Sequence, residues 1–186
     1  MARKESKKMP MEAKNFREAL RAVRAFAFDV DGVLTNSRVL INERGELLRN
    51  ANTRDGYALH QAALAGYPIA IITGGFQEGV GHRYAALGIT DVYLGAYDKV
   101  EALKDFCKKR MVSAESILYM GDDLPDYEVM QRVGMPVCPL DASSDILNIS
   151  RYVSPYAGGE GCVRDVVEQV MRLQGKWRVG GEEGAD

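Results

Sequence analysis

The sequence predicts an α/β fold, a Rossmann-like parallel sheet with helices on both faces. Short apolar stretches alternate along the chain with segments that have helical spacing, and this alternation is typical of a parallel sheet covered on both sides. Three of the apolar stretches end in side chains that can take part in chemistry: Asp29 and Asp31, Thr73, and Asp122 and Asp123. Ligands bind beyond the carboxyl ends of the strands in such sheets, so we expect a site at that edge.

Length and composition predict one cytoplasmic domain. The chain has 186 residues, 46% of them apolar, which is enough for a full core. A net charge of −2 gives no reason to expect a nucleic-acid partner. Cys107, Cys138 and Cys162 are far apart and form no CxxC pair, so we expect neither a disulfide framework nor a zinc site. No apolar segment has the length of a signal peptide core or a membrane span, so we expect no membrane partner.

The elements follow from apolar spacing, taken in chain order. Phe16, Leu20 and Val23 predict a helix over residues 11–24, leading into an apolar strand over residues 25–28. A β-hairpin follows that strand, because residues 37–41 and 46–49 flank a glycine-containing turn. Further strands are predicted over 68–73, 91–94, 116–120 and from 135, and further helices over 55–65, 77–87, 98–111, 127–133, 144–150 and 161–173. We expect a single domain over residues 11–176, with flexible tails at 1–10 and 177–186.

The first strand ends on two acids. Asp29 and Asp31 would point to opposite faces of a continuous strand. If the strand ends at Asp29, both carboxylates can turn toward one point beyond the sheet. Two carboxylates placed together are costly unless a cation offsets their repulsion. The alternative is an ordinary strand followed by an Asp-Gly turn.

Four sequence parts in a fixed order indicate the chemistry. They are Asp29-x-Asp31-Gly32-x-x-Thr35, Thr73-Gly74, Lys99, and Gly121-Asp122-Asp123-x-x-Asp126. This order and spacing resembles the haloacid dehalogenase superfamily of phosphohydrolases, and the likeness covers about residues 25–173.

The resemblance implies a role for each catalytic side chain. Asp29 is expected to be the nucleophile, forming an aspartyl-phosphate that water hydrolyses. Asp31 is expected to protonate the leaving alkoxide and then to accept a proton from the attacking water. Thr73 and the amide that follows it are expected to bind phosphoryl oxygens, and Lys99 to neutralise charge on the nucleophile and the transferring group. A lysine that opens a helix is otherwise an ordinary solvated residue.

The resemblance also implies a metal site. Asp122 is expected to bind the ion directly, with Asp29 and the backbone carbonyl of Asp31. Asp123 and Asp126 are expected to bind the waters of the ion or to hold Lys99; the alternative for Asp126 is an early-turn acid favoured by the helix dipole. Neither histidine lies in a motif. Carboxylate and carbonyl ligands suit a hard cation, so Mg²⁺ is the expected cofactor.

The chain has no room for a cap domain. Only a hairpin separates Thr35 from Asp55, and only a helix and a strand separate Gly75 from Lys99. This organisation is similar to the capless branch that contains the 3-deoxy-D-manno-octulosonate 8-phosphate phosphatases of lipopolysaccharide biosynthesis. The matching stretches are residues 52–57, 83–88 and 158–164. That family forms tetramers through the hairpin, and a C-terminal segment of one subunit approaches a neighbour's site, so the resemblance implies a homotetramer.

Substrate contacts follow only from this resemblance. Arg83 is expected to bind the carboxylate of a phosphorylated sugar acid through two parallel hydrogen bonds. The other expected substrate contacts are Thr35, Asp55, Gly56, Gly74, Gly75 and Arg164, the last arriving with the C-terminal segment.

The eight-carbon sugar is the expected substrate, with one departure from the family pattern. Many members have arginine where this chain has Gly75, which enlarges the pocket or moves substrate contacts elsewhere. Relatives that act on nine-carbon acids, 2-keto-3-deoxynononate 9-phosphate or N-acylneuraminate 9-phosphate, tend to carry a charged residue such as Glu there. Gly75 and Ala86 offer no such charge, which favours the eight-carbon substrate and keeps the nine-carbon acids as the alternative.

Two other classes of protein share parts of this pattern. Some relatives have lost acids and serve as non-catalytic assembly modules, but this chain retains every acid of the motifs. Phosphoaccepting signalling domains also use an aspartate on a parallel α/β fold, yet their motifs come in another order and they do not need Asp31.

Overall fold

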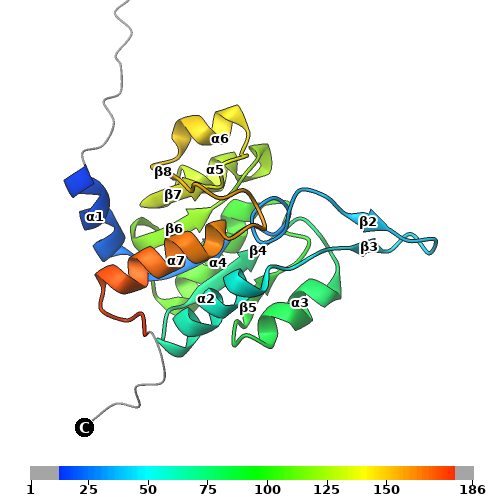
Figure 1. Ribbon diagram of the computed structural model, residues 1–186, viewed down its shortest axis with the longest axis horizontal. Coiled ribbons are helices and arrows are strands. Elements are labelled where there is room, and N and C mark those ends of the chain that lie inside the picture. The colour runs from blue at the N-terminus through cyan, green and yellow to red at the C-terminus, as the bar shows by residue number, and fades with distance from the viewer. Residues whose placement is uncertain (1–12, 179–186) are drawn as a thin grey trace, which may run out of the picture.

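A six-stranded parallel sheet forms the centre of the molecule (Figure 1). The computed structural model describes residues 13–178, with side chains from residue 16. The strands lie in the order β5-β4-β1-β6-β7-β8, and all neighbouring pairs are parallel. Their bounds are β1 Ala25–Phe28, β4 Ile69–Ile72, β5 Asp91–Tyr93, β6 Ile117–Met120, β7 Met135–Cys138 and β8 Tyr152–Val153. The predicted fold class is confirmed.

Helices cover both faces of the sheet. On one face lie α1 (Ala13–Ala22), α2 (Thr53–Leu64) and α7 (Cys162–Leu173), with α3 (Glu78–Ala85) beside β5 at the edge. On the other face lie α4 (Lys99–Arg110), α5 (Tyr127–Met130) and α6 (Ser144–Ile149). Each face therefore has its own apolar core.

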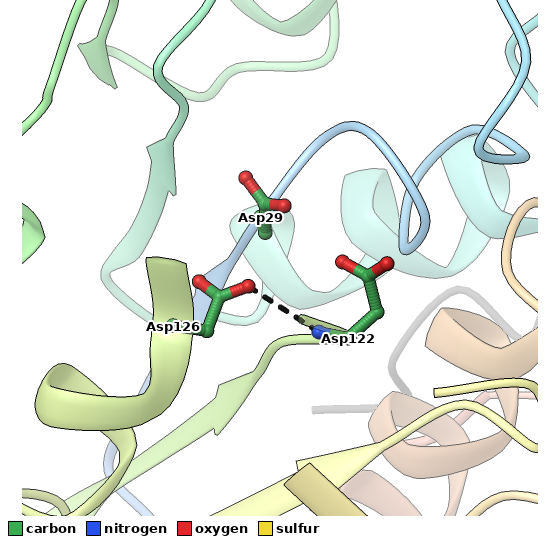
Figure 2. A group of neighbouring side chains, drawn as sticks. All are labelled: Asp29, Asp122 and Asp126. Atoms are coloured by element: carbon green, nitrogen blue, oxygen red, sulfur yellow. Dashed lines mark hydrogen bonds between the residues drawn. The ribbon is translucent and has the colours of Figure 1, made fainter. Parts of the chain in front are cut away.

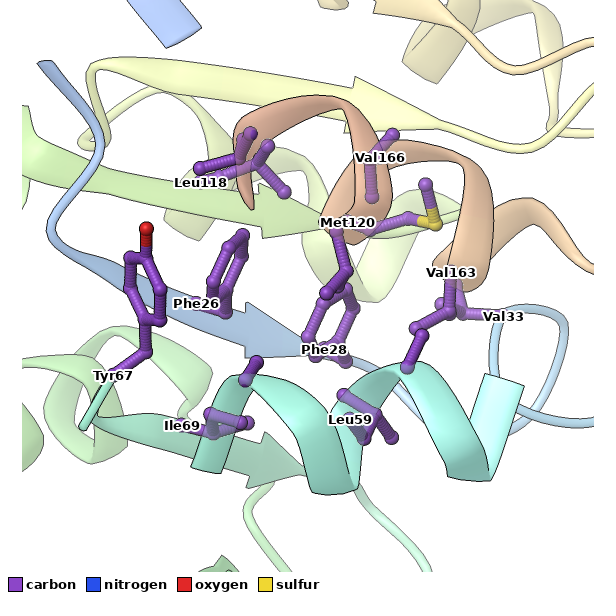
Figure 3. Packing of buried hydrophobic residues seen from close by; sticks show 14 of the residues in the cluster. Phe26, Phe28, Val33, Leu59, Tyr67, Ile69, Leu118, Met120, Val163 and Val166 are labelled. Atoms are coloured by element: carbon purple, nitrogen blue, oxygen red, sulfur yellow. The ribbon is translucent and has the colours of Figure 1, made fainter. Parts of the chain in front are cut away.

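Strand β1 contributes to both cores because successive side chains point to opposite faces. Phe26 and Phe28 pack between β1 and the helices α2 and α7 (Figure 3), whereas Ala25 and Ala27 face the second core. All four side chains are fully buried. The end of β1 is therefore fixed from both sides, and that end carries Asp29.

Several elements are shorter than the sequence predicts, most clearly α5 (Tyr127–Met130) and the strands of the hairpin. Helix α5 ends at Met130 rather than near residue 133. Gly134, the residue before β7, lies so close to the preceding loop that a Cβ atom there would be 1.8 Å from the Glu115 carbonyl oxygen. The helix ends early enough for the chain to make this approach. The predicted hairpin is present, but its strands β2 (Leu40–Ile41) and β3 (Leu47–Leu48) have two residues each.

The hairpin projects away from the body of the protein (Figure 1). It forms a separate two-stranded sheet. Its apolar side chains have little cover: Leu40 is 67% exposed and Ile41 66% exposed. A short exposed sheet with apolar residues is a surface available for pairing with another chain.

The predicted tail at residues 1–10 lies outside the described residues, as do residues 179–186 of the second tail. Within the described part of that second tail, Trp177 packs against the core under α7 and lies edge-on to Tyr57. No helix within residues 13–178 combines the length and the apolar character that a membrane span requires.

Candidate active site

The three strand ends that the sequence singles out are neighbours in the sheet. Strand β1 lies between β4 and β6, so Asp29, Thr73 and Asp122 follow adjacent strands at one edge. Because all strands are parallel, this edge is the carboxyl edge at which ligands bind.

Three carboxylates gather at this edge (Figure 2). Oxygen atoms of Asp29, Asp122 and Asp126 all lie within 4.8 Å of one another. Asp29 and Asp126 are buried and Asp122 is partly exposed, so the group opens to solvent on one side. Asp126 lies in the segment that follows β6, and its carboxylate also accepts a hydrogen bond from the Asp122 amide at 3.3 Å.

Lys99 joins two of these carboxylates. It is the first residue of α4, and its Nζ atom lies 2.8 Å from Asp29 and 2.7 Å from Asp126. Its side chain is only 5% exposed. The alternative of a solvated helix-opening lysine does not describe this residue. The fully buried Tyr119 extends the chain of contacts, because its hydroxyl donates to Asp126 at 2.6 Å.

The charge at the site is unbalanced in a way that fits a divalent cation. Three carboxylates and one ammonium leave two negative charges in a largely buried space. Burial, together with the charge of Asp126, raises the pKa of Asp29 to about 7 despite the neighbouring Lys99. Burial and the charges of Asp29 and Asp126 raise the pKa of Asp122 to about 8. A divalent ion among these oxygens would offset the repulsion and keep the carboxylates ionised.

The turn after β1 allows this gathering. Gly32 has a φ of +99°, and a Cβ atom there would lie 2.0 Å from a carboxylate oxygen of Asp122. Only glycine fits this position. Thr35 closes the turn: its amide and hydroxyl donate to the Val30 carbonyl at 2.9 and 3.1 Å. Thr35 was expected to contact substrate, but it is buried and its hydroxyl is used within the turn.

Asp31 does not join the three carboxylates. Its two oxygens instead accept hydrogen bonds from Arg49, Nε at 2.5 Å and Nη2 at 2.8 Å. Arg49, which follows β3 at the base of the hairpin, was not among the residues expected at the site, and neither was Tyr119. Neither residue lies in a motif, and only the fold brings them to the site.

The end of β4 presents a small polar surface. Thr73 is buried, and its hydroxyl accepts a hydrogen bond from the Gly75 amide at 3.1 Å. Nothing lies within 4 Å of the position that a Cβ atom of Gly74 would take. A Cβ atom at Gly75 would lie 3.5 Å from Nη2 of Arg49. The Arg49 guanidinium is therefore close to the space that Gly75 leaves.

Two of the predicted substrate contacts lie together on α2 and α3. A Cβ atom at Gly56 would lie 2.5 Å from Nη2 of Arg83, so the guanidinium rests on the α2 backbone. Asp55 is buried, and its carboxylate accepts a hydrogen bond from the Arg164 amide at 2.7 Å, near the start of α7. Burial raises the pKa of Asp55 to about 6. Asp55 thus holds the first turn of α7 and is not one of the three clustered carboxylates.

Arg164 and Asp123 are not part of the acidic group. The Arg164 side chain pairs with Glu168 at 3.0 Å and lies over the rings of Tyr57 and Trp177. The glycine-rich stretch before it packs on the turn after β1 of the same chain, where the Gly159 amide donates to the Val33 carbonyl at 2.9 Å. Asp123 is exposed, and its backbone carbonyl accepts a hydrogen bond from the Asp126 amide at 2.8 Å.

Comparison with known proteins gives one consistent result. Residues 85–164 match the family of haloacid dehalogenase-like hydrolases. The chain is 39% identical over 154 residues to 3-deoxy-D-manno-octulosonate 8-phosphate phosphatase KdsC of Escherichia coli K12, covering 83% of this chain and 82% of that protein.

Solved structures that resemble this chain include phosphatases of the same name. A putative 3-deoxy-D-manno-octulosonate 8-phosphate phosphatase from Vibrio cholerae superimposes with a TM-score of 0.83 at 36% identity, covering 88% of this chain and 92% of the other. The Moraxella catarrhalis phosphatase of the same name, in complex with magnesium, phosphate and a KDO molecule, has a TM-score of 0.84 at 29% identity. This match covers 88% of this chain and 94% of the other.

Proposed function

Since the chain belongs to the 3-deoxy-D-manno-octulosonate 8-phosphate phosphatase family of haloacid dehalogenase-like hydrolases, we propose that it hydrolyses this phosphorylated eight-carbon sugar acid to KDO and phosphate. The observation that carries the proposal is the buried group of Asp29, Asp122 and Asp126 with Lys99 between two of its members. This group supplies a nucleophile, a cation partner and a place for a metal ion.

The reaction proceeds in two half-reactions. A carboxylate oxygen of Asp29 bonds to phosphorus while the bond to the sugar oxygen breaks, and Asp31 gives that oxygen a proton. Water then attacks the aspartyl-phosphate, Asp31 takes the proton of the water, and Asp29 is released. Lys99 holds Asp29 in place and balances charge as the phosphoryl group arrives. Asp29, Asp122 and the Asp31 carbonyl would hold Mg²⁺, which would supply further charge stabilisation to the phosphoryl oxygens.

Thr73 and the following amides would bind the phosphoryl oxygens, and Arg83 would meet the sugar-acid carboxylate. The position of Arg83 against Gly56 supports this role, since the two residues were expected to line one pocket. Gly75 leaves the pocket free of a charged side chain from that position, which favours the eight-carbon substrate. The Arg164 side chain pairs with Glu168 of the same chain. It would contact substrate only if assembly of subunits brought it to a neighbour's site.

The protein would work as a cytoplasmic homotetramer that prepares KDO for lipopolysaccharide synthesis. The exposed leucine and isoleucine side chains of the hairpin support assembly through this element. Pairing of hairpins between subunits would cover these side chains and satisfy the free strand edges.

A phosphate-release screen with Mg²⁺ tests the proposal. Eight- and nine-carbon 2-keto-3-deoxy sugar-acid phosphates are compared by kcat/KM, and the eight-carbon substrate is expected to be preferred. Asp29→Asn, which keeps the shape and removes the nucleophile, should abolish turnover and leave the circular dichroism spectrum unchanged. Preference for a nine-carbon acid would contradict the substrate assignment. The absence of turnover with every ester would favour a non-catalytic assembly module.

A further inference from the structure

The side chain of Arg49 has an unusual environment for a hairpin residue. It directly follows β3, on a hairpin in which Leu40, Ile41 and Leu48 are exposed, yet only 10% of its own side chain is exposed. The side chain turns back from the hairpin to the loop after β1. Its Nη1 atom donates to the Leu47 carbonyl at 3.2 Å, which fixes the guanidinium to the end of the hairpin.

The guanidinium donates two parallel hydrogen bonds to the Asp31 carboxylate. Nε donates to one carboxylate oxygen at 2.5 Å and Nη2 to the other at 2.8 Å. This fork geometry fixes the plane of a carboxylate as well as its position. The Thr35 hydroxyl makes one weaker contact with Asp31 at 3.4 Å. Arg49 is therefore the main restraint on the orientation of the Asp31 side chain.

Arg49 also lies near the turn that follows β4. Its Nη2 atom lies 3.5 Å from the position that a Cβ atom of Gly75 would take, and the Thr73 hydroxyl lies 3.4 Å from the same position. The guanidinium thus binds the loop after β1 and lies close to the turn after β4. Asp31 remains 38% exposed, so its carboxylate is still open to a substrate.

We propose that Arg49 is a positioning residue that aims Asp31 at the leaving oxygen. The inference rests on the proposed function, in which Asp31 transfers the proton. Carboxylate oxygens have about four lone-pair positions in all, and the fork occupies two, so proton transfer to the leaving oxygen remains possible. Arg49 itself neither gives nor takes a proton. It reduces the freedom of a surface-accessible aspartate that must meet the substrate in one geometry.

The alternative is that the contact only attaches the hairpin to the body of the protein. The two roles differ in how the effect of removing Arg49 depends on the leaving group. Loss of a purely structural contact lowers kcat/KM equally for every substrate, whereas loss of a positioned acid lowers it most for substrates whose leaving group needs a proton. Phenyl phosphate and 4-nitrophenyl phosphate differ by one nitro group, and nitrophenolate leaves readily without protonation. Because kcat/KM reports the steps up to the first phosphoryl transfer, it isolates the step in which Asp31 acts as an acid.

The test measures kcat/KM for both esters with Mg²⁺ in the wild type and in the variants Arg49→Met, Arg49→Lys and Asp31→Asn. The matched control is Arg44→Met, an exposed arginine in the turn of the same hairpin. Since general acid catalysis contributes about 10²–10⁴-fold, we expect Arg49→Met to lower kcat/KM for phenyl phosphate by about tenfold or more. The value for 4-nitrophenyl phosphate should fall by less than about threefold, and Arg49→Lys should lie between wild type and Arg49→Met.

The double variant with Asp31→Asn and Arg49→Met completes the experiment. If Arg49 acts through Asp31, its replacement should have little further effect once Asp31 is gone. Equal losses on the two esters, or an undiminished loss in the double variant, would overturn the inference. If Asp31→Asn shows no dependence on the leaving group, the acid role in the proposed function fails instead. Should Arg49→Met not fold, Arg49→Lys alone decides, because it keeps the charge and loses the fork.

Discussion

Replacement of Asp122 by asparagine should stabilise the protein in the absence of metal. Asp122 stands beside Asp29 and Asp126, and burial and these charges raise its pKa to about 8. In the unfolded chain the same carboxyl group has an ordinary pKa of 3.8. Between these two values the folded state binds more protons than the unfolded state, so the free energy of unfolding falls as pH rises. Asparagine has the same shape and removes this cost.

The size of the effect follows from the pKa difference. At pH 7.5 the linkage relation gives a cost of about 5 kcal/mol for Asp122. Asp122 is partly exposed, and solvent screening reduces the expected gain from Asp122→Asn to about 2 kcal/mol. For a domain of this size that corresponds to a rise in Tm of about 4–8 °C.

Thermal unfolding followed by circular dichroism measures this gain. Wild type and Asp122→Asn are compared at pH 5 and pH 7.5, each with EDTA and with MgCl₂. The variant should gain more at pH 7.5 than at pH 5, and Mg²⁺ should stabilise the wild type but hardly the variant. Asp123→Asn is the matched control, because Asp123 is exposed and outside the carboxylate group. A lower Tm for Asp122→Asn in EDTA, or equal stabilisation of both proteins by Mg²⁺, would show that Asp122 does not carry this electrostatic cost.

Three further substitutions test individual contacts. Tyr119→Phe removes the hydroxyl that donates to Asp126; it should lower stability by about 1 kcal/mol in urea unfolding and lower kcat, since Asp126 also holds Lys99. Gly56→Ala places a methyl group against the Arg83 guanidinium; it should raise KM for the sugar-acid phosphate and leave KM for 4-nitrophenyl phosphate unchanged. Gly32→Ala combines a positive φ with a clash against Asp122; it should lower Tm and abolish phosphate release, and a fully active variant would contradict the tight approach of these two residues.

The positions of the strands and of the main acids could be predicted because they depend on local patterns. The apolar run at residues 25–28 predicts β1 with its observed bounds, and parallel connections require all strand ends to lie at one edge. Asp29 directly follows β1, and one residue separates Asp122 from the end of β6. The fold class alone therefore brings the two acids near each other.

Contacts between side chains on different elements could not be predicted in this way. The bond between Arg49 and Asp31 spans 18 residues and depends on the direction in which the hairpin leaves the sheet. The contacts of the Arg164 side chain with Glu168 and with the ring of Tyr57 likewise follow from the packing of α7 and from no local pattern. The hydrogen bond of the Thr35 hydroxyl to the Val30 carbonyl depends in the same way on the path of the turn after β1.

Local sequence patterns specify the layers of the fold, the edge at which the site lies and the acids at that edge, because strand periodicity and parallel connection act through neighbouring residues. The partner of each of these acids is set instead by three-dimensional packing. Lys99 and Tyr119 hold Asp126, and Arg49 holds Asp31. Such pairings depend on distances between elements far apart in the chain, and these distances are set by the packing of whole cores.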